Sequence, residues 1–419
     1  MLRDMLAHPI ESWSHLERWV NQGSPSGYTG IHGVSNRYRP DNPALSFKLG
    51  LYSACSPARI STETTMDDAP LPQASQALLR HLPVHPDVAL FPENSAWLAM
   101  LEKVAEIDVV PSSSARTVTV LDCDESGVGL KLHYNRIIGR FNRTLPYRKL
   151  RASLDVDSML DLLSAHFPRE LAYLREPFAL WTVDGDGKEI GGGALIRVMR
   201  PYPHSASKAT LVPIFSLWSS DREAPHHPAL LVQWLGEFEA PGEALFEYLL
   251  APLLQGYAFL AWRNGLIPEC NAQNVLLELN DELRSPRIVH RDLQGFYKDI
   301  QCMPCERQRH LRTTEKQLSV GKETERHRAQ QQRSYLFDFK LGDYVLMPLI
   351  QTASKEFGID ANAVVRRVRE LVMELAKSVD LPKDYFPDFP VWYGQTSGLP
   401  SNPRDLYEER RFPVFRAGP

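Results

Sequence analysis

The most apolar part of the chain is residues 244–262, with the sequence ALFEYLLAPLLQGYAFLAW. Its length and composition predict a helix, and the Asn264-Gly265 pair that follows tolerates the left-handed backbone conformation common at helix ends. Glu247 and Pro252 interrupt the apolar run. We therefore expect a buried core helix and not a membrane span.

Two short apolar segments follow, residues 275–279 and 287–293, separated by the polar sequence NDELRSP. Apolar runs of this length that flank a polar turn are typical of a β-hairpin. The ends of this region are denser in carboxamides, carboxylates and cations than any other part of the chain. These residues are Glu269, Asn271, Gln273 and Asn274 at one end, and His290, Arg291 and Asp292 at the other.

A second hairpin is predicted in the first half, with strands over residues 117–121 and 128–134 on either side of DCDESG. Side chains alternate between the two faces of a strand, so the second strand should have one apolar face and one polar face. The apolar face would carry Leu130, Leu132 and Tyr134, and the other Lys131 and His133.

The remaining pattern adds helices on both sides of these hairpins. Residues 95–107 are predicted to be helical, and residues 335–357 to form a buried helix. The charged stretch 306–333 between them indicates a solvated helix or a mobile loop. Asp360 should cap a final helix whose apolar positions recur at helical spacing, which predicts a core-facing stripe. The stripe is Val364, Val365, Val368, Leu371, Val372 and Leu375.

Composition sets outer limits on this picture. The chain has 419 residues, is 43% hydrophobic and carries a net charge of −4, so it can bury a large core and should form two or three domains. The balanced charge gives no basis for nucleic acid or an anionic membrane as a partner. No basic-then-apolar leader opens the sequence, and its five cysteines are unevenly placed. We expect a cytoplasmic protein.

The dense region carries a recognisable motif. The sequence E-x-N-x-Q-N ending at Asn274, then VLLEL, a turn, and R-x-V-x-R-D ending at Asp292 resembles the E-x-H-x-Q-N … R-D region of one family. This is the aerobactin-synthetase-like (IucA/IucC) family of siderophore synthetases, which work independently of nonribosomal peptide synthetases. A second motif agrees upstream in the same order. The S-x-R-T segment from Ser114, followed by Lys131 and Arg143, is similar to the family's nucleotide-binding segment.

The resemblance implies an α+β protein of cupped-hand architecture, with a sheet-containing fingers domain and a helical palm domain. Residues 1–90 would be a remnant of the N-terminal region leading into the fingers, 91–240 the fingers and 241–419 the palm. Most of the family's N-terminal thumb would be missing. The family's reaction is ATP-dependent adenylation of a carboxylate, citrate or a citrate derivative, followed by condensation with an amine or hydroxylamine to form an amide. ATP and Mg²⁺ are the implied cofactors, and a homodimer is compatible with the resemblance.

Activating a carboxylate with ATP brings an anion onto a polyanion, so fixed cations and hydrogen-bond donors must offset the charge. By resemblance, six residues would bind the nucleotide: Ser114, Arg116, Thr117, Lys131, Gln273 and Asn274. Arg143 would act in catalysis and, together with Arg197, contact the acid substrate. Glu269 and Asp292 would be Mg²⁺ ligands, since Mg²⁺ prefers one or two carboxylates plus phosphate oxygens.

Each of these residues also has a purely structural interpretation. The arginines near Arg143 could form a solvated helix face, an Asn can cap a turn, and the Arg291-Asp292 pair could be an internal salt bridge. At the catalytic position Asn271 the family carries His, and a neutral amide cannot supply a proton or a positive charge. The alternative function is therefore a catalytically weakened or inactive relative that binds nucleotide or a partner synthetase.

Other motifs fit less well. The sequence from His290 to Leu293 imitates the H-R-D-L loop of protein kinases, but that loop needs an Asn where Tyr297 stands. Gly191 to Gly193 lie in a predicted strand and not in a phosphate-binding loop. The C-x-x-C from Cys302 has no second pair with which to complete a zinc site.

Overall fold

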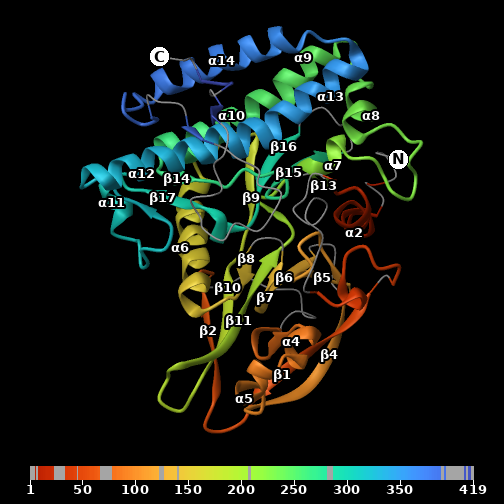
Figure 1. The fold of residues 1–419 in the computed structure, drawn as a ribbon, viewed down its shortest axis with the longest axis vertical. Coiled ribbons are helices and arrows are strands. Elements are labelled where there is room, and N and C mark those ends of the chain that lie inside the picture. Colours follow the sequence, from red (N-terminus) through yellow and green to blue (C-terminus); the bar gives the residue numbers. More distant parts are fainter. Residues whose placement is uncertain are drawn as a thin grey trace.

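The computed structural model describes residues 5, 8–22, 34–44, 46–66, 78–121, 127–138, 141–205, 209–280, 286–387, 391–392, 410–411 and 414–416. Within these residues, helices gather at one end of the molecule and a large sheet lies at the other, with a smaller sheet between them (Figure 1). The turn sequences of both predicted hairpins, 122–126 and 281–285, fall outside the described residues.

The large sheet has eight strands in the order β2-β10-β11-β6-β5-β4-β1-β3, and every neighbouring pair is antiparallel. The strands are β1 (Phe47–Ala54), β2 (Arg59–Thr64), β3 (Leu82–Val84), β4 (Leu101–Pro111), β5 (Thr117–Val120), β6 (Val128–Leu132), β10 (Phe178–Val183) and β11 (Glu189–Val198). The predicted hairpin is confirmed as β5 and β6, which pair Thr117 with Lys131.

The helix predicted over residues 95–107 is wrong. Only Ser95–Leu98 is helical, as α5, and Leu101–Pro111 is the strand β4. The sequence LEKVAEI is rich in helix-forming residues, but β1 pairs with this segment from Val109 to Leu101. Long-range pairing on both edges of β4 therefore overrides a local helix propensity, which is a weak preference.

The smaller sheet has five strands in the order β12-β9-β16-β15-β13. They are β9 (Leu171–Leu174), β12 (Pro201–Tyr202), β13 (Ala209–Pro213), β15 (Val275–Asn280) and β16 (Arg287–His290). β15 and β16 are antiparallel, which confirms the second predicted hairpin, whereas β16 and β9 are parallel. This sheet takes strands from both sides of residue 240.

The chain passes from the smaller sheet to the larger one and back within a short stretch. β9 leads directly into β10 and β11, and β12 then returns to pair with β9, matching Pro201 to Leu174. Helix α6 (Tyr147–Ser164) spans both sheets (Figure 1). Leu150 and Leu154 pack with side chains of β10 and β11, whereas Leu160 packs with residues of the smaller sheet. The two sheets are therefore held together by α6 and by two short chain crossings.

The helical end is built from two long helical arms, each a continuous run of helical segments, and a final helix. One arm is α9 (Pro241–Leu245), η4 (Phe246–Leu250), α10 (Ala251–Tyr257) and η5 (Ala258–Arg263), and the other is α12 (Glu323–Ser334), η7 (Tyr335–Leu346) and α13 (Met347–Phe357). The final helix is α14 (Ala361–Ser378), capped as predicted by Asp360, whose carboxylate accepts the N–H of Asn362 at 2.9 Å.

The arm over residues 241–263 is the core helix that the sequence predicts. Among the described residues it is the one helix long and apolar enough to cross a membrane, and 67% of its apolar window is buried inside the protein. Its side chains join a large core cluster with those of α13 and α14. The predicted stripe of α14 faces this core, with Val364, Val368 and Val372 buried.

Several shorter elements complete the fold. The helical ones are α2 (Pro9–Trp19), η1 (Asn36–Tyr38), α4 (Pro86–Leu90), η3 (Pro92–Asn94), α7 (Ile214–Trp218), α8 (Leu230–Leu235), η6 (Leu293–Gly295) and α11 (Cys305–Gln308). The strands β14 (Leu266–Ile267), β17 (Tyr297–Asp299) and β18 (Gln317–Leu318) form a small sheet, and β7 (Tyr134–Ile138) pairs with β8 (Phe141–Arg143). β19 (Val391–Trp392) pairs with β20 (Arg410–Arg411).

Gly265 ends the core helix in the left-handed region, as the sequence predicts, with φ at +67°. A Cβ there would lie 2.5 Å from the backbone oxygen of Asp299 and 2.7 Å from the nitrogen of Met303. Gly358 shares the same φ of +67° but has nothing within 4 Å. Gly358→Ala should lower the free energy of unfolding by about 1–2 kcal/mol, which is the strain of a left-handed residue. Gly265→Ala should lower it by clearly more, because the backbone around Asp299 and Met303 must also move. Denaturant unfolding of both variants checks this, and equal losses would contradict it.

Candidate functional site

The antiparallel register of β15 and β16 brings the two ends of the dense region together. Val275 pairs with His290, so the loop from Glu269 to Asn274 lies beside the residues that follow β16. Asp292, the second residue after the end of β16, adopts the left-handed conformation with φ of 64°. This end of the hairpin faces the large sheet through β6 and the loop before β5, as the following contacts establish.

Lys131 joins the two sheets. Its ammonium group forms an ion pair with the carboxylate of Asp292, and the Lys131 side chain is 4% exposed. Leu130 and Leu132 on either side are fully buried in the core of the large sheet, which confirms the predicted alternation along β6. Burial lowers the pKa of Lys131 to about 8, against the attraction of Asp292. Burial alone would raise the pKa of Asp292, but Lys131 and Arg197 hold it well below its ordinary value.

Arg116 lies next to this ion pair. Its guanidinium donates to the backbone oxygens of Arg143 at 2.9 Å and Leu132 at 3.4 Å. Burial, together with the charge of Arg143, lowers the pKa of Arg116 to about 9, so the group stays a cation at neutral pH. Burial also lowers the pKa of Arg143, whereas Asp292 and Glu269 raise it. The predicted cations Arg116, Lys131 and Arg143 are thus brought together around Asp292.

Ser114 and Thr117 shape the turn that carries Arg116. The Ser114 hydroxyl accepts the N–H of Thr117 at 3.2 Å and lies 3.2 Å from the hydroxyl of Ser112. Ala115 within the turn has φ of 61°. Thr117 is the cross-strand partner of Lys131, so the S-x-R-T segment and Lys131 are adjacent through sheet pairing.

Gln273 reaches across to the same turn. Its side-chain amide donates to the hydroxyl of Ser113 at 3.0 Å, a contact between residues 160 positions apart in the sequence. Asn274 is 7% exposed and directly follows Gln273. The carboxamide region of the second half therefore touches the S-x-R-T region of the first.

Asn271 has a local structural contact. Its side-chain oxygen accepts the N–H groups of Gln273 and Asn274, each at 3.0 Å. This arrangement is an Asx turn, in which a side chain replaces a backbone acceptor. The turn fixes the backbone that presents both carboxamides.

Glu269 is held by two lysines. Lys340 lies 3.3 Å and Lys316 3.8 Å from its carboxylate oxygens. Burial would raise the pKa of Glu269, but these two lysines lower it, whereas the neighbouring Asp292 opposes them. The Lys340 ammonium also lies 5.4 Å from the ring centre of Tyr335 and 5.8 Å from that of Tyr344.

Arg197 on β11 is buried near Asp292. Its guanidinium pairs with Glu176, with Nε 3.0 Å from the carboxylate, and both side chains are at most 5% exposed. Burial lowers the pKa of Arg197, but Glu176 and Asp292 more than compensate, so the pKa lies above its ordinary value. Arg197 is thus near Asp292 electrostatically but makes its direct contact with Glu176.

Two carboxylates in this region suit a divalent cation. Glu269 and Asp292 both have lowered pKa values and are therefore ionised at neutral pH, and Asp292 raises the pKa of Glu269, as a nearby like charge does. No group of three or more His, Cys, Asp or Glu residues that could hold a metal occurs in the described part of the chain. A pair of carboxylates fits Mg²⁺, which takes one or two of them and completes its shell with phosphate oxygens or water.

Four contributors were not identified from the sequence: Ser113, Glu17, Lys316 and Lys340. Ser113 and Glu17 lie 96 positions apart yet share hydrogen bonds. Lys340 occurs in the sequence F-D-F-K, and Lys316 lies in the charged stretch predicted to be solvated. The helical spacing of Trp13, Leu16 and Val20 is a sequence signal that could have placed Glu17 on an apolar helix face, where a carboxylate is unusual.

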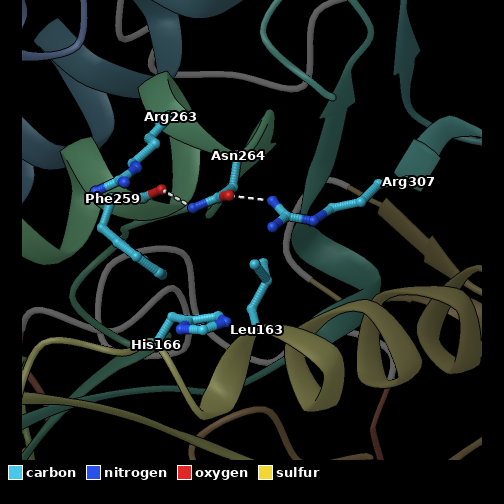
Figure 2. Close-up of a pocket in the computed structure, with 6 residues that line it drawn as sticks. All are labelled: Leu163, His166, Phe259, Arg263, Asn264 and Arg307. Atoms are coloured by element: carbon cyan, nitrogen blue, oxygen red, sulfur yellow. Dashed lines mark hydrogen bonds between the residues drawn. The ribbon is translucent and has the colours of Figure 1, made fainter. Parts of the chain in front are cut away.

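A separate cavity of about 460 Å³ lies at the end of α6, and none of the predicted site residues lines it. Figure 2 shows Asn264 in its wall between Phe259 and Arg307, donating to the backbone oxygen of Phe259 at 2.6 Å and accepting from Arg307. The other lining residues are Leu163, His166 and Arg263.

No family model matches the sequence, and no curated protein matches it. Solved structures do match. The aerobactin synthetase IucA from a hypervirulent pathotype of Klebsiella pneumoniae aligns with a TM-score of 0.69 at 15% identity, over 99% of this chain and 81% of that chain. Its ATP-bound structure gives a TM-score of 0.66 at 16% identity, over 92% of this chain and 74% of that one.

The petrobactin biosynthesis protein AsbB from Bacillus anthracis str. Sterne aligns with a TM-score of 0.67 at 13% identity, over 87% of this chain and 68% of that chain. The chain therefore has the α+β fold of these siderophore biosynthesis proteins. This confirms the predicted fold class, and it bears out at the level of fold the resemblance drawn from the two motifs.

Proposed function

We propose that this chain is an ATP-dependent ligase of siderophore biosynthesis. It would adenylate a carboxylate, citrate or a citrate derivative, with release of pyrophosphate. The nitrogen of an amine or hydroxylamine would then attack the acyl adenylate, forming the amide and releasing AMP and a proton. The observation that carries the proposal is the contact between Lys131 and Asp292, which joins the two motif-bearing halves of the chain. The ATP-bound structure of IucA, which shares the fold, supports ATP as the nucleotide.

In this proposal the cations offset the charge of the phosphates and the incoming acid. Arg116 and Lys131 would contact phosphate oxygens, and the Ser114 and Thr117 hydroxyls would add neutral donors. Gln273 would orient the nucleotide beside Asn274.

The remaining roles concern the acid and the metal. Arg143 would stabilise charge at the reacting carboxylate, and the buried Arg197 on β11 would add positive potential there. Glu269 and Asp292 would hold Mg²⁺, which supplies further positive charge at the phosphates when bound. Lys131, now paired with Asp292, would then exchange that partner for phosphate.

Residues 91–240 would act as fingers and 241–419 as palm, with residues 1–90 leading into the fingers. The protein would work in the cytoplasm, with small-molecule substrates and as a homodimer.

A second function is favoured by one observation at Asn271. Its side-chain oxygen is engaged in the Asx turn, and an amide cannot supply the proton or charge of the family's His. The alternative is thus a relative with weakened or absent catalysis that still binds nucleotide or a partner synthetase.

Two measurements on the full chain separate these functions. Pyrophosphate release is followed with ATP, Mg²⁺ and citrate, with and without a panel of polyamines and hydroxylamines, and ATP binding is measured by calorimetry. The ligase proposal expects pyrophosphate above background together with ATP binding. ATP binding with background pyrophosphate across the panel would favour the alternative, and failure to bind ATP would overturn both.

The pKa of Lys131 gives a pH dependence. The folded protein holds this amine as a cation below about pH 8, because burial lowers its pKa. ATP affinity should therefore be present below that pH and decline as pH rises through about 8. A Lys131→Arg variant keeps its charge throughout this range, so its affinity should change less between pH 7 and 9. Calorimetry at several pH values checks this, and parallel declines in both proteins would assign the titration to another group.

A further inference from the structure

Glu17 is a fully buried carboxylate on helix α2, at 0% exposure. Trp13 and Leu16 are buried on the same helix, and so is the neighbouring Arg18. A buried carboxylate is costly unless it is paired and hydrogen-bonded, so its contacts indicate why it is there.

Glu17 contacts one residue from each half of the candidate site. One carboxylate oxygen accepts both the N–H of Ser113 at 2.9 Å and its hydroxyl at 2.6 Å. The other lies 2.6 Å from the guanidinium of Arg291 in an ion pair between side chains that are 1% and 4% exposed. The same guanidinium lies 4.9 Å from the ring centre of Trp13, so α2 holds it from two positions.

These contacts close a ring through Gln273. Arg291 Nε donates to the backbone oxygen of Gln273 at 2.6 Å, and the Gln273 side chain donates to the Ser113 hydroxyl at 3.0 Å. Ser113 and Arg291 each return to Glu17. Four residues from three distant segments therefore fix one another's positions.

The ring lies against the groups proposed to bind ATP. Ser113 immediately precedes Ser114 in the turn that carries Arg116, and Arg291 immediately precedes Asp292. The hydroxyl of Ser113 donates to Glu17, which leaves its lone pairs to accept from the Gln273 amide. Because Glu17 sets the direction of this hydroxyl, it also sets the orientation of the Gln273 carboxamide.

We propose that Glu17 is a positioning residue for the nucleotide site. It holds the Ser113 turn and Arg291 at a fixed separation, and through them it aims the Gln273 carboxamide at the nucleotide. Glu17 acts only through these neighbours. The inference rests on the proposed function, because it assigns Gln273 the role of a nucleotide contact.

The test compares ATP binding and thermal unfolding in three full-length proteins: wild type, Glu17→Gln and Glu11→Gln. Glu11 lies on the same helix but is exposed, so Glu11→Gln is a matched control that should equal wild type in both measurements. In Glu17→Gln the negative charge is lost and one acceptor oxygen becomes an NH₂ donor, so the side chain can keep an acceptor toward Ser113 or toward Arg291 but not toward both, and it forms no ion pair. ATP affinity should fall at least about tenfold, as expected when a charge-assisted contact is lost.

A Ser113→Ala variant makes the test independent of the folding of Glu17→Gln. It removes the hydroxyl that links Glu17 to Gln273, so it should also weaken ATP binding, and the double variant should be no weaker than the worse single one. A lower Tm with unchanged ATP affinity in Glu17→Gln would mean a merely structural role and would overturn the inference, as would unchanged affinity in Ser113→Ala. If wild type itself bound no ATP, the proposed function would fail, and the positioning role with it.

Discussion

Lys131→Met should lower ATP affinity and the rate of any ATP-dependent pyrophosphate release, each by about a hundredfold or more. Loss of one preorganised charged donor at a reacting phosphate has effects of this size. The substitution keeps the length and apolar stem of the side chain but removes the cation that pairs with Asp292. Calorimetry with ATP and a pyrophosphate-release assay measure the two losses.

A matched control exists in the same sheet. Lys48 on β1 pairs with Asp108 on β4 at 2.5 Å, with side chains 58% and 34% exposed, so Lys48→Met should leave ATP binding unchanged. Lys131→Met will also lower the Tm, because it leaves the Asp292 carboxylate without its partner. Adding Asp292→Asn should recover part of the Tm but none of the ATP binding. ATP affinity within threefold of wild type in Lys131→Met would contradict the proposed role.

Asp299→Asn should lower the free energy of unfolding by about 3–5 kcal/mol, the usual cost of leaving one member of a buried ion pair uncompensated. Asp299 on β17 accepts from Arg333 on α12 through both oxygens, at 2.7 and 2.8 Å, and both side chains are fully buried. Arg333 also donates to Gln301 and to the backbone of Tyr385. The substitution removes the negative charge and one of the two acceptor oxygens, and therefore leaves the guanidinium buried without its counter-ion.

The control for this substitution is Asp384→Asn. Asp384 lies 4.0 Å from Arg326, and both side chains are about half exposed, at 50% and 53%, so its loss should change stability by less than about 0.5 kcal/mol. Denaturant unfolding of both variants gives the comparison. Since these carboxylates are absent from the candidate site, ATP affinity measured below the unfolding transition should stay that of wild type. Equal stability of the two variants would show that the buried pair contributes nothing net.

The sequence predicted those parts of the site whose geometry follows from local periodicity. The two-residue repeat of a strand places Lys131 opposite the buried faces of Leu130 and Leu132, and the structure confirms this. A polar turn between two apolar runs predicted the β15–β16 hairpin, and antiparallel pairing then brings its flanks together. The S-x-R-T and E-x-N-x-Q-N motifs occur in the order found in the family, and this predicted that the two halves of the chain contribute to one site.

Contacts between distant segments could not be predicted in this way. The strand β4 has a helix-favouring composition and is extended only because β1 and β5 pair with its edges. Glu17, Ser113 and Lys340 gain their importance from partners far away in the sequence. A single sequence carries no signal for such partners, because burial and charge pairing at long range depend on the finished packing.

The parallel pairing of β9 with β16 also constrains how the protein can be made. Leu171 is matched to Ile288, so the middle of the smaller sheet is complete only after residue 290 has left the ribosome. Until then the nascent chain carries β9 with an unpaired edge, a kind of exposure that favours aggregation. Chains truncated before this point should therefore aggregate unless chaperones bind them. The eight-stranded sheet differs, because its last strand ends at Val198 and the whole sheet can form earlier in synthesis.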